Sequence, residues 1–384
     1  MELNATRRHS LDGLRAAAAI SVAFYHGILH FDTSLIERVL YRPILSVEGG
    51  EFGTKLLLIV FNGESSIIIF FVLSGFVLQG ALTRMSGRTT AATVAVFTLQ
   101  RIIRIYPALV VCVALLLALS LAAQRAGFGR FPAFSWGQAA ENAVLYAPSI
   151  HGPSWSVQVE VFCIPFLLAA EVLRRRYGLL GLSCLVVYAL IAIEYPVLVF
   201  RLPALWPYLF MFILGMLAAS PAAAFMVRGL HPAAVWVAIP MFLAARHVTS
   251  RAAISGLIAQ GLAAALLVGC IAYRDDAVTR ALSARAMVFL GRISYSFYLL
   301  NVIALYLMWA VIETWVAEPG YHAVLWGLLS ATASVALTIP AAAISERLVE
   351  RPGIRIGHLL LRDRPIPRAR RLQRATAEAD TGGV

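Results

Sequence analysis

The stretch that decides the fold is residues 105–124, IYPALVVCVALLLALSLAAQ, which runs for twenty residues without a charged side chain. A helix of about 20 apolar residues is long enough to cross the hydrocarbon core of a bilayer. In a soluble domain a surface helix would instead alternate apolar and polar residues with the helical period. The stretch therefore predicts a membrane-spanning helix, and arginines bound it at Arg104 and Arg125.

Similar stretches recur along the chain. Of its 384 residues, 60% are hydrophobic and only 14% are charged, and the mean hydropathy is +0.79, whereas soluble proteins are about 25% charged. Helices are expected, because an open sheet cannot satisfy its backbone in lipid. The prediction is an all-α polytopic membrane protein with about ten spans, at 11–31, 62–82, 105–124, 154–173, 178–195, 203–220, 232–248, 252–273, 286–311 and 321–347.

The net charge of +12 comes almost entirely from arginine, with Lys55 the only lysine. Most arginines fall in loops on one side of the expected membrane, and the other side also holds acidic residues such as Asp32 and Glu37. This asymmetry follows the positive-inside rule and predicts both termini in the cytoplasm. Topology accounts for the charge, so no nucleic acid partner is expected. The expected location is a bacterial inner or plasma membrane.

The spans form one expected transmembrane domain, residues 1–352. An arginine- and proline-rich tail follows at 353–384, which we expect to be disordered and cytoplasmic. The first span contains Asp12, Arg15 and His26, which the apolar core of a cleavable signal peptide would avoid. The four cysteines lie in apolar stretches without metal-site spacing, so neither a metal nor a permanently bound cofactor is expected.

Polar groups inside membrane spans are costly, so they are the first candidates for function. Arg15 and His26 are eleven residues apart in the first span. At about 100° per residue, both side chains lie on one helical face, about 16 Å apart. A neutral histidine in such a site can act as a general base that deprotonates a hydroxyl. Hydrogen bonding between packed helices is the alternative role for His26.

Arg101 and Arg104 open the third expected span, just before Tyr106. Arginines three residues apart share a helix face and present two guanidinium groups together, which suits phosphate or pyrophosphate. The same pattern fits interfacial arginines beside a snorkelling tyrosine. In the second span, Ser74 and Gly75 form a notch where a neighbouring helix or a ligand can approach closely.

Polar residues also mark the fourth and tenth spans. Ser156 and Glu160 share one helical face beside Trp155, which fits a sugar platform and fits equally an interface tryptophan with a serine helix cap. Hydroxyls on several faces of the ninth span are consistent with hydrogen bonds between helices. At the end of the tenth, Glu346 and Glu350 alternate with arginines, which indicates local ion pairs or a role in ordering a donor site.

In this order, the motifs resemble the acyltransferase-3 family of integral membrane O-acyltransferases. The resemblance covers residues 10–352. It rests on six motifs: Leu11-Asp12-Gly13-Leu14-Arg15 with His26, Phe70 to Phe76, Arg101 to Pro107, Trp155-Ser156 with Glu160, Ile293 to Leu299, and Glu350-Arg351-Pro352. Each motif is short, and it is their order across the spans that makes the resemblance specific.

The resemblance implies transfer of an acyl group, usually acetyl, from cytosolic acyl-CoA to a sugar hydroxyl of a glycan or glycolipid. The expected partners are acyl-CoA, a carbohydrate or glycolipid acceptor and the lipid bilayer. The expected site residues are His26 as the catalytic histidine; Arg15, Arg101, Arg104, Tyr106 and Ser74 for acyl-CoA; Trp155, Ser156 and Glu160 for the acceptor; and Glu350, Arg351 and Asn301 in support.

The chain departs from the family pattern at two places. The family often has Gly-Val-Asp before its phenylalanine pair, where this chain has Ser66-Ile67-Ile68. A histidine commonly follows the Ser-Tyr-x-x-Tyr-Leu element, where this chain has Asn301. Asparagine donates and accepts hydrogen bonds but cannot carry a proton, so no second catalytic histidine is expected there.

A transporter or flippase of lipid-linked sugars, without covalent chemistry, is the alternative function, because it too needs polar residues inside the membrane. Such proteins more often show repeated halves and broken spans at matching positions. No such symmetry is evident in this sequence.

Overall fold

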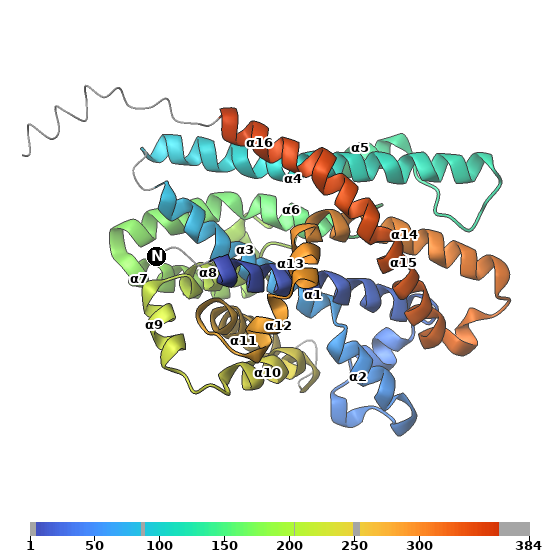
Figure 1. Ribbon diagram of the computed structural model, residues 1–384, viewed down its shortest axis with the longest axis horizontal. Helices are drawn as coiled ribbons and strands as arrows, with labels where there is room; N and C mark the ends of the chain where they lie inside the picture. Colours follow the sequence, from blue (N-terminus) through green and yellow to red (C-terminus); the bar gives the residue numbers. More distant parts are fainter. Residues whose placement is uncertain (1–4, 86–88, 203, 249–253, 361–384) are drawn as a thin grey trace, which may run out of the picture.

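The computed structural model describes residues 5–85, 89–202, 204–248 and 254–360, and these residues form helices and loops without a strand. The central helix is α1, which packs against α3, α11, α12, α13, α14 and α15 (Figure 1). The long helix α4 lies beside α16 along one edge of the bundle (Figure 1). The all-helical fold class is confirmed for the described residues.

The helices, in chain order, are α1 (Ala5–His30), α2 (Phe52–Val60), α3 (Gly63–Arg84), α4 (Thr90–Arg125), α5 (Trp136–Ala143), α6 (Ser154–Phe162), α7 (Ile164–Glu194), α8 (Leu209–Ala218), α9 (Pro221–Gly229), α10 (Ala234–Val248), α11 (Ile254–Tyr273), α12 (Ala277–Leu282), α13 (Arg285–Arg292), α14 (Ser294–Trp315), α15 (Ala323–Ser345) and α16 (Arg351–Leu360). Short π- or 3₁₀-helical turns are η1 (Ile36–Leu40), η2 (Ile44–Ser46), η3 (Gly49–Glu51), η4 (Pro196–Val199), η5 (Pro319–His322) and η6 (Glu346–Glu350).

Six helical runs in the described part of the chain are long and apolar enough to cross a membrane: Gly49–Arg84, Thr90–Arg125, Ser154–Glu194, Ile254–Tyr273, Ser294–Trp315 and Pro319–Gly357. A seventh results if α8 and α9, which meet at 74°, count as one bent span. The chain is thus a multi-pass membrane protein. The count of ten spans and the cytoplasmic location of the termini stay predictions.

Two expected spans fall on one helical run. Gly178 divides α7 with a φ of 60°, a left-handed conformation that favours glycine. After this turn the chain folds back on itself. The close approach shows this, since a Cβ atom on Gly181 would lie 2.5 Å from the carbonyl oxygen of Leu173. The spans expected at 154–173 and 178–195 therefore lie on either side of Gly178.

The expected start of α4 is wrong. The helix begins at Thr90 and not near residue 105, and the hydroxyl of Thr89 accepts from the backbone N–H of Ala92 at its first turn. An apolar stretch marks only the part of a helix that lies in lipid, whereas a threonine cap marks where the helix starts. Arg101 and Arg104 therefore lie inside α4 and do not open it.

Backbone contacts at glycines hold the bundle together. A Cβ atom on Gly75 of α3 would lie 1.9 Å from the carbonyl oxygen of Phe212, and one on Gly215 of α8 would lie 2.0 Å from that of Val72. Small residues allow this close approach of helices in membranes. The notch expected at Ser74 and Gly75 is thus filled on the Gly75 side by α8.

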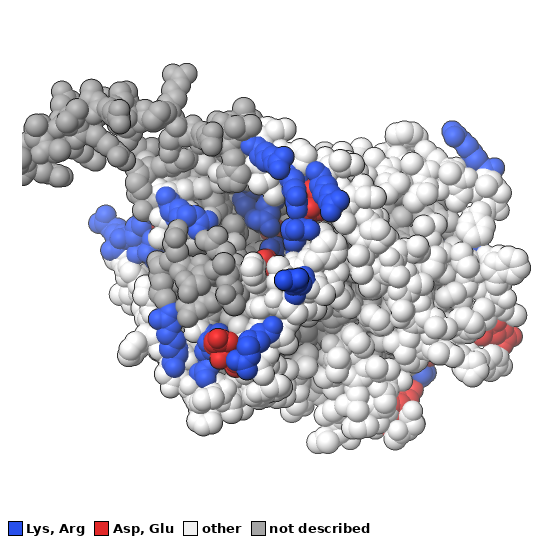
Figure 2. Space-filling view, viewed as in Figure 1, with Lys and Arg blue, Asp and Glu red and all other residues white. Residues whose placement is uncertain are grey.

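Basic side chains gather toward the left of the face in Figure 2, and much of the rest of that face is uncharged. We call the end of the bundle that carries Arg15, Arg84 and Arg174 the arginine-rich end. Of the tail expected at 353–384, residues 353–360 belong to α16, and 361–384 lie outside the described residues.

Candidate active site

An ion pair between α4 and α6 forms the centre of the site. Arg101 donates from Nη2 to Oε2 of Glu160 at 2.7 Å, and the Ser74 hydroxyl of α3 donates to Oε1 at 2.8 Å. The Arg101 side chain is 9% exposed. The structure thus brings together three motifs that are far apart in the sequence, and the two charges neutralise each other where few waters reach them.

Two more arginines adjoin this ion pair. Arg15 of α1 is close enough to Arg101, Arg104 and Glu160 to interact with them electrostatically. Among the described residues, neither Arg15 nor Arg104 forms a direct ion pair, and the buried Nε of Arg101 has no hydrogen-bond partner. Three guanidinium groups therefore share one directly bonded carboxylate. We call Arg15, Arg101 and Arg104 the arginine group, and an arrangement of this kind suits an anion such as phosphate.

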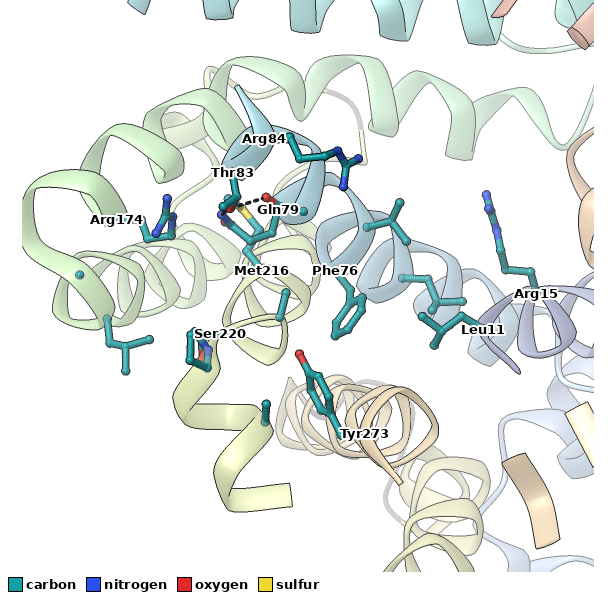
Figure 3. Close-up of a pocket in the computed structure, with 18 of the residues that line it drawn as sticks. Leu11, Arg15, Phe76, Gln79, Thr83, Arg84, Arg174, Met216, Ser220 and Tyr273 are labelled. Atoms are coloured by element: carbon teal, nitrogen blue, oxygen red, sulfur yellow. Dashed lines mark hydrogen bonds between the residues drawn. The ribbon is translucent and has the colours of Figure 1, made fainter. Parts of the chain in front are cut away.

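A cavity of about 910 Å³ lies at the arginine-rich end, and Arg15 is the member of the arginine group that lines it. Arg15 lies at one side of it, and Arg84 and Arg174 lie at other sides (Figure 3). Its apolar lining includes Phe76 and Met216. The volume lies at the upper end of the range for small-molecule sites, and the basic rim favours an anionic ligand.

Gln79 and Arg174, which the sequence did not single out, line this cavity, and both are hydrogen-bonded to Glu171. Gln79 of α3 donates to Oε2 of Glu171 at 3.0 Å, and Glu171 also accepts from Arg174 and Arg175 of α7. Glu171 is 2% exposed. The available signal was a glutamine and a glutamate inside apolar helices, which are costly unless they are paired.

His26 and Arg15 lie on one continuous helix, as the sequence predicts. The His26 side chain is exposed. Tyr295 and Tyr298 of α14 are half-buried. The His26 ring lies 5.4 Å from the Tyr25 ring and makes no hydrogen bond to any described residue, so its nitrogens are available to a ligand.

The expected acceptor residues lie inside the bundle. Trp155 packs against Phe71 and Tyr208, with ring centroids 6.3 and 5.6 Å away. The hydroxyls of Ser156 and Tyr298 are 2.8 Å apart. The expected serine cap is wrong, because α6 begins after Pro153 without a side-chain cap. Ser154 is instead bonded to His151 in the preceding loop and to Asn142 of α5.

The supporting residues hold helices together at separate places. Asn301 donates to Ser334 and Thr338 of α15, at 3.3 Å each, and so joins α14 to α15. Tyr106 packs among the apolar side chains around α4. Glu350 accepts from the backbone N–H of Ser296 at 3.0 Å. Arg351 donates to Glu346 at 2.6 Å, so its carboxylate partner is Glu346.

The geometry sorts the expected site residues into two groups. Ser74, Arg101 and Glu160 are in direct contact, with Arg15 and Arg104 close by. Glu160, expected on the acceptor side, is thus bonded to a residue expected on the acyl-CoA side. Asn301 and Arg351 make their hydrogen bonds within the helix packing and not to the arginine group.

Comparison with known proteins gives one match. No curated protein and no solved structure matches the chain. A family model described as an acyltransferase domain matches residues 8–344, a range that includes His26, the arginine group and Glu160. Five of the six motifs lie within the matched range, and Glu350-Arg351-Pro352 lies beyond it. The chain therefore belongs to the acyltransferase-3 family of membrane proteins.

Proposed function

We propose that the protein is an O-acyltransferase that moves an acyl group, by default acetyl, from cytosolic acyl-CoA to a sugar hydroxyl of a cell-surface glycan or glycolipid. One observation carries the proposal. Helix α1 presents Arg15, which has no direct ion pair to a described residue, and His26, which has no hydrogen bond to one, and both side chains keep accessible surface.

The arginine group supports an acyl-CoA site at the arginine-rich end. Its guanidinium groups suit the phosphates of coenzyme A, and the adjoining cavity is large enough for much of a nucleotide. Glu160 holds Arg101, and Ser74 holds Glu160. We therefore assign Glu160 to the donor side, with Tyr106 at the next turn of α4.

The distance between Arg15 and His26 supports a division of labour along α1. Eleven residues of helix correspond to about 16 Å, which an extended pantetheine arm can cover. A donor whose phosphates are held at Arg15 would then carry its thioester to His26. Ser156, which lies 2.8 Å from the Tyr298 hydroxyl, and the neighbouring Trp155 would contact the acceptor.

The chemistry needs one base. The neutral His26 ring takes the proton of the acceptor hydroxyl while that oxygen attacks the thioester carbonyl carbon. The carbon–sulfur bond then breaks, and the coenzyme A thiolate receives the proton that His26 holds. The ester forms on the sugar, free coenzyme A leaves, and His26 is neutral again.

The test uses the purified protein in nanodiscs with radiolabelled acetyl-CoA. We expect His26→Gln to keep the melting temperature and acetyl-CoA binding but to lose about 100-fold or more in turnover, the usual contribution of a general base. Neutralising Arg101 and Arg104 to glutamine is expected to weaken acetyl-CoA binding. His231→Gln, at an exposed histidine in the loop before α10, is the matched control.

Full activity of a well-folded His26→Gln variant would rule out the base role. Failure of the wild type to bind acetyl-CoA at any concentration would favour the transporter or flippase.

A further inference from the structure

A second polar cluster lies at the other end of α3. Glu64, in the first turn of α3, pairs with Arg246 of α10, with 3.2 Å between Oε2 and Nη1, and accepts from the Tyr25 hydroxyl of α1 at 3.4 Å. Tyr208, just before α8, is close enough to Glu64 and Arg246 to interact with both electrostatically. We call Tyr25, Glu64, Tyr208 and Arg246 the Glu64 cluster. Glu64 precedes Ser74 by ten residues, or about 15 Å of helix.

The Glu64–Arg246 pair is not the sole link between α3 and α10 in the described part of the chain. Asn62 and His247 are 2.9 Å apart, link the same segments and are 4% and 3% exposed. Gln260 of α11 donates to Ser65 at 2.6 Å, also fully enclosed. These pairs already tie α3 to α10 and α11.

The ion pair of the Glu64 cluster is more accessible than these buried hydrogen-bonded pairs. The Glu64 and Arg246 side chains are 25% and 16% exposed, whereas Asn62 and His247 are almost fully buried. An accessible charge pair is costly inside a membrane bundle. An accessible ion pair between helices that other hydrogen bonds also join is a candidate for binding a ligand.

The position of the cluster fits the reaction centre. Tyr25 precedes His26, and their rings are in edge contact at 5.4 Å. The hydroxyl that His26 deprotonates must come within hydrogen-bond reach of its ring. Whatever holds the acceptor must therefore lie beside His26, on the side away from the arginine group. The Glu64 cluster occupies that position.

The chemistry of the cluster fits a sugar. A carboxylate accepts from sugar hydroxyls, and a guanidinium and two phenols donate to them. The Tyr208 and Trp155 rings, 5.6 Å apart, offer aromatic faces to the C–H face of a sugar ring. A few polar groups among aromatic side chains are typical of small-molecule sites.

We infer that the Glu64 cluster binds the acceptor sugar and presents one of its hydroxyls to His26; this inference rests on the proposed function.

The experiment measures KM separately for donor and acceptor. The protein in nanodiscs receives radiolabelled acetyl-CoA and, in turn, the methyl glycosides of glucose, galactose, mannose and N-acetylglucosamine. For the glycoside that the wild type acetylates, Glu64→Gln and Arg246→Gln are expected to raise KM about tenfold or more, since a hydrogen bond to a charged group is lost. The KM for acetyl-CoA is expected to stay within about twofold.

Two further variants make the result specific. Arg38→Gln is the control for Arg246→Gln, because it also removes an arginine charge from an ion pair. Arg38 is exposed in η1, after α1, where it pairs with Asp32 and Glu51. Both KM values are expected to stay unchanged in this variant. Tyr208→Phe removes one hydroxyl and keeps the ion pair, so it serves as the test if a charge variant fails to fold. Its expected effect is a smaller rise in the glycoside KM alone.

The outcomes are distinguishable. An unchanged glycoside KM in the Glu64, Arg246 and Tyr208 variants overturns the inference, and so does an equal rise in both KM values with a lower melting temperature. Acetyl-CoA turnover that none of the glycosides accelerates also overturns the inference alone. Absence of acetyl-CoA turnover in the wild type overturns the proposed function as well.

Discussion

Replacing Gly75 by alanine is expected to separate α3 from α8. The added Cβ atom would lie 1.9 Å from the carbonyl oxygen of Phe212 and 2.8 Å from its carbonyl carbon. Both are backbone atoms in the middle of α8, so no side-chain rotation can relieve the overlap. The reciprocal contact of Gly215 with Val72, at 2.0 Å, means that the helices touch at two places and cannot pivot around one of them.

The magnitude follows from the overlap. Ordinary van der Waals contact of a Cβ atom begins at 3.4 Å, so α3 and α8 must move apart by about 1.5 Å. Buried side chains such as Val72 and Phe212 would lose contact along the whole interface. Overpacking of a well-filled core costs about 1–3 kcal/mol, and a backbone overlap belongs at the upper end, about 3 kcal/mol.

Gly80 provides the matched control in the same helix. A Cβ atom there meets only the tip of the Arg84 side chain, at 3.7 Å, and alanine favours a helix by about 0.5–1 kcal/mol over glycine. Thermal unfolding of both variants in nanodiscs is expected to show a lower melting temperature for Gly75→Ala and an unchanged or higher one for Gly80→Ala. Equal melting temperatures would refute the backbone contact.

Three further outcomes are expected from buried polar groups. Glu160→Gln leaves Arg101 without its carboxylate and should cost about 3 kcal/mol in thermal unfolding, whereas the double variant with Arg101→Gln should recover much of this loss, because no unpaired charge remains. Lys55→Met removes three hydrogen bonds from Nζ to backbone carbonyls in the segment after α1, so this segment should be cleaved faster in limited proteolysis. Burial lowers the pKa of His151 to about 4, against the opposing effect of its hydrogen bond to a backbone carbonyl; stability should therefore fall as the pH drops below about 6.5, by about 2 kcal/mol at pH 5, and the melting temperature of His151→Gln should depend less on pH.

The placement of His26 and Arg15 on one helix could be predicted, because it depends on local sequence alone. A charged or titratable residue in an apolar stretch is conspicuous, and the helical period alone places two such residues on one face. Arg101 and Arg104 were recognisable for the same reason. The start of their helix could not be recognised from the sequence, since the capping hydroxyl of Thr89 lies among polar residues outside the apolar stretch.

The partners of these residues could not be predicted, because they depend on which helices are neighbours. Glu160 is four residues from Ser156, and helical spacing put both on one face. In the structure this face borders two helices, so Ser156 meets Tyr298 of α14 whereas Glu160 meets Arg101 of α4. The pairing of Glu64 with Arg246 joins residues separated by 182 positions, and nothing in either local segment indicates it.

The packing of α1 bears on how the two substrates meet. Near the first turns of α1, a Cβ atom on Gly291 of α13 would lie 2.0 Å from the carbonyl oxygen of Asp12. Near its last turns, a Cβ atom on Gly27 would lie 2.6 Å from the carbonyl oxygen of Gly327 of α15. Backbone contacts at both ends prevent α1 from sliding or rotating without the helices around it. Arg15 and His26 therefore keep their separation, since the helix between them is continuous. In a transporter, one bundle rocks against the other to expose a site to each side in turn. For the proposed reaction, a fixed α1 favours a donor that extends its own flexible arm to His26, and an acceptor that enters from the end that carries Glu64.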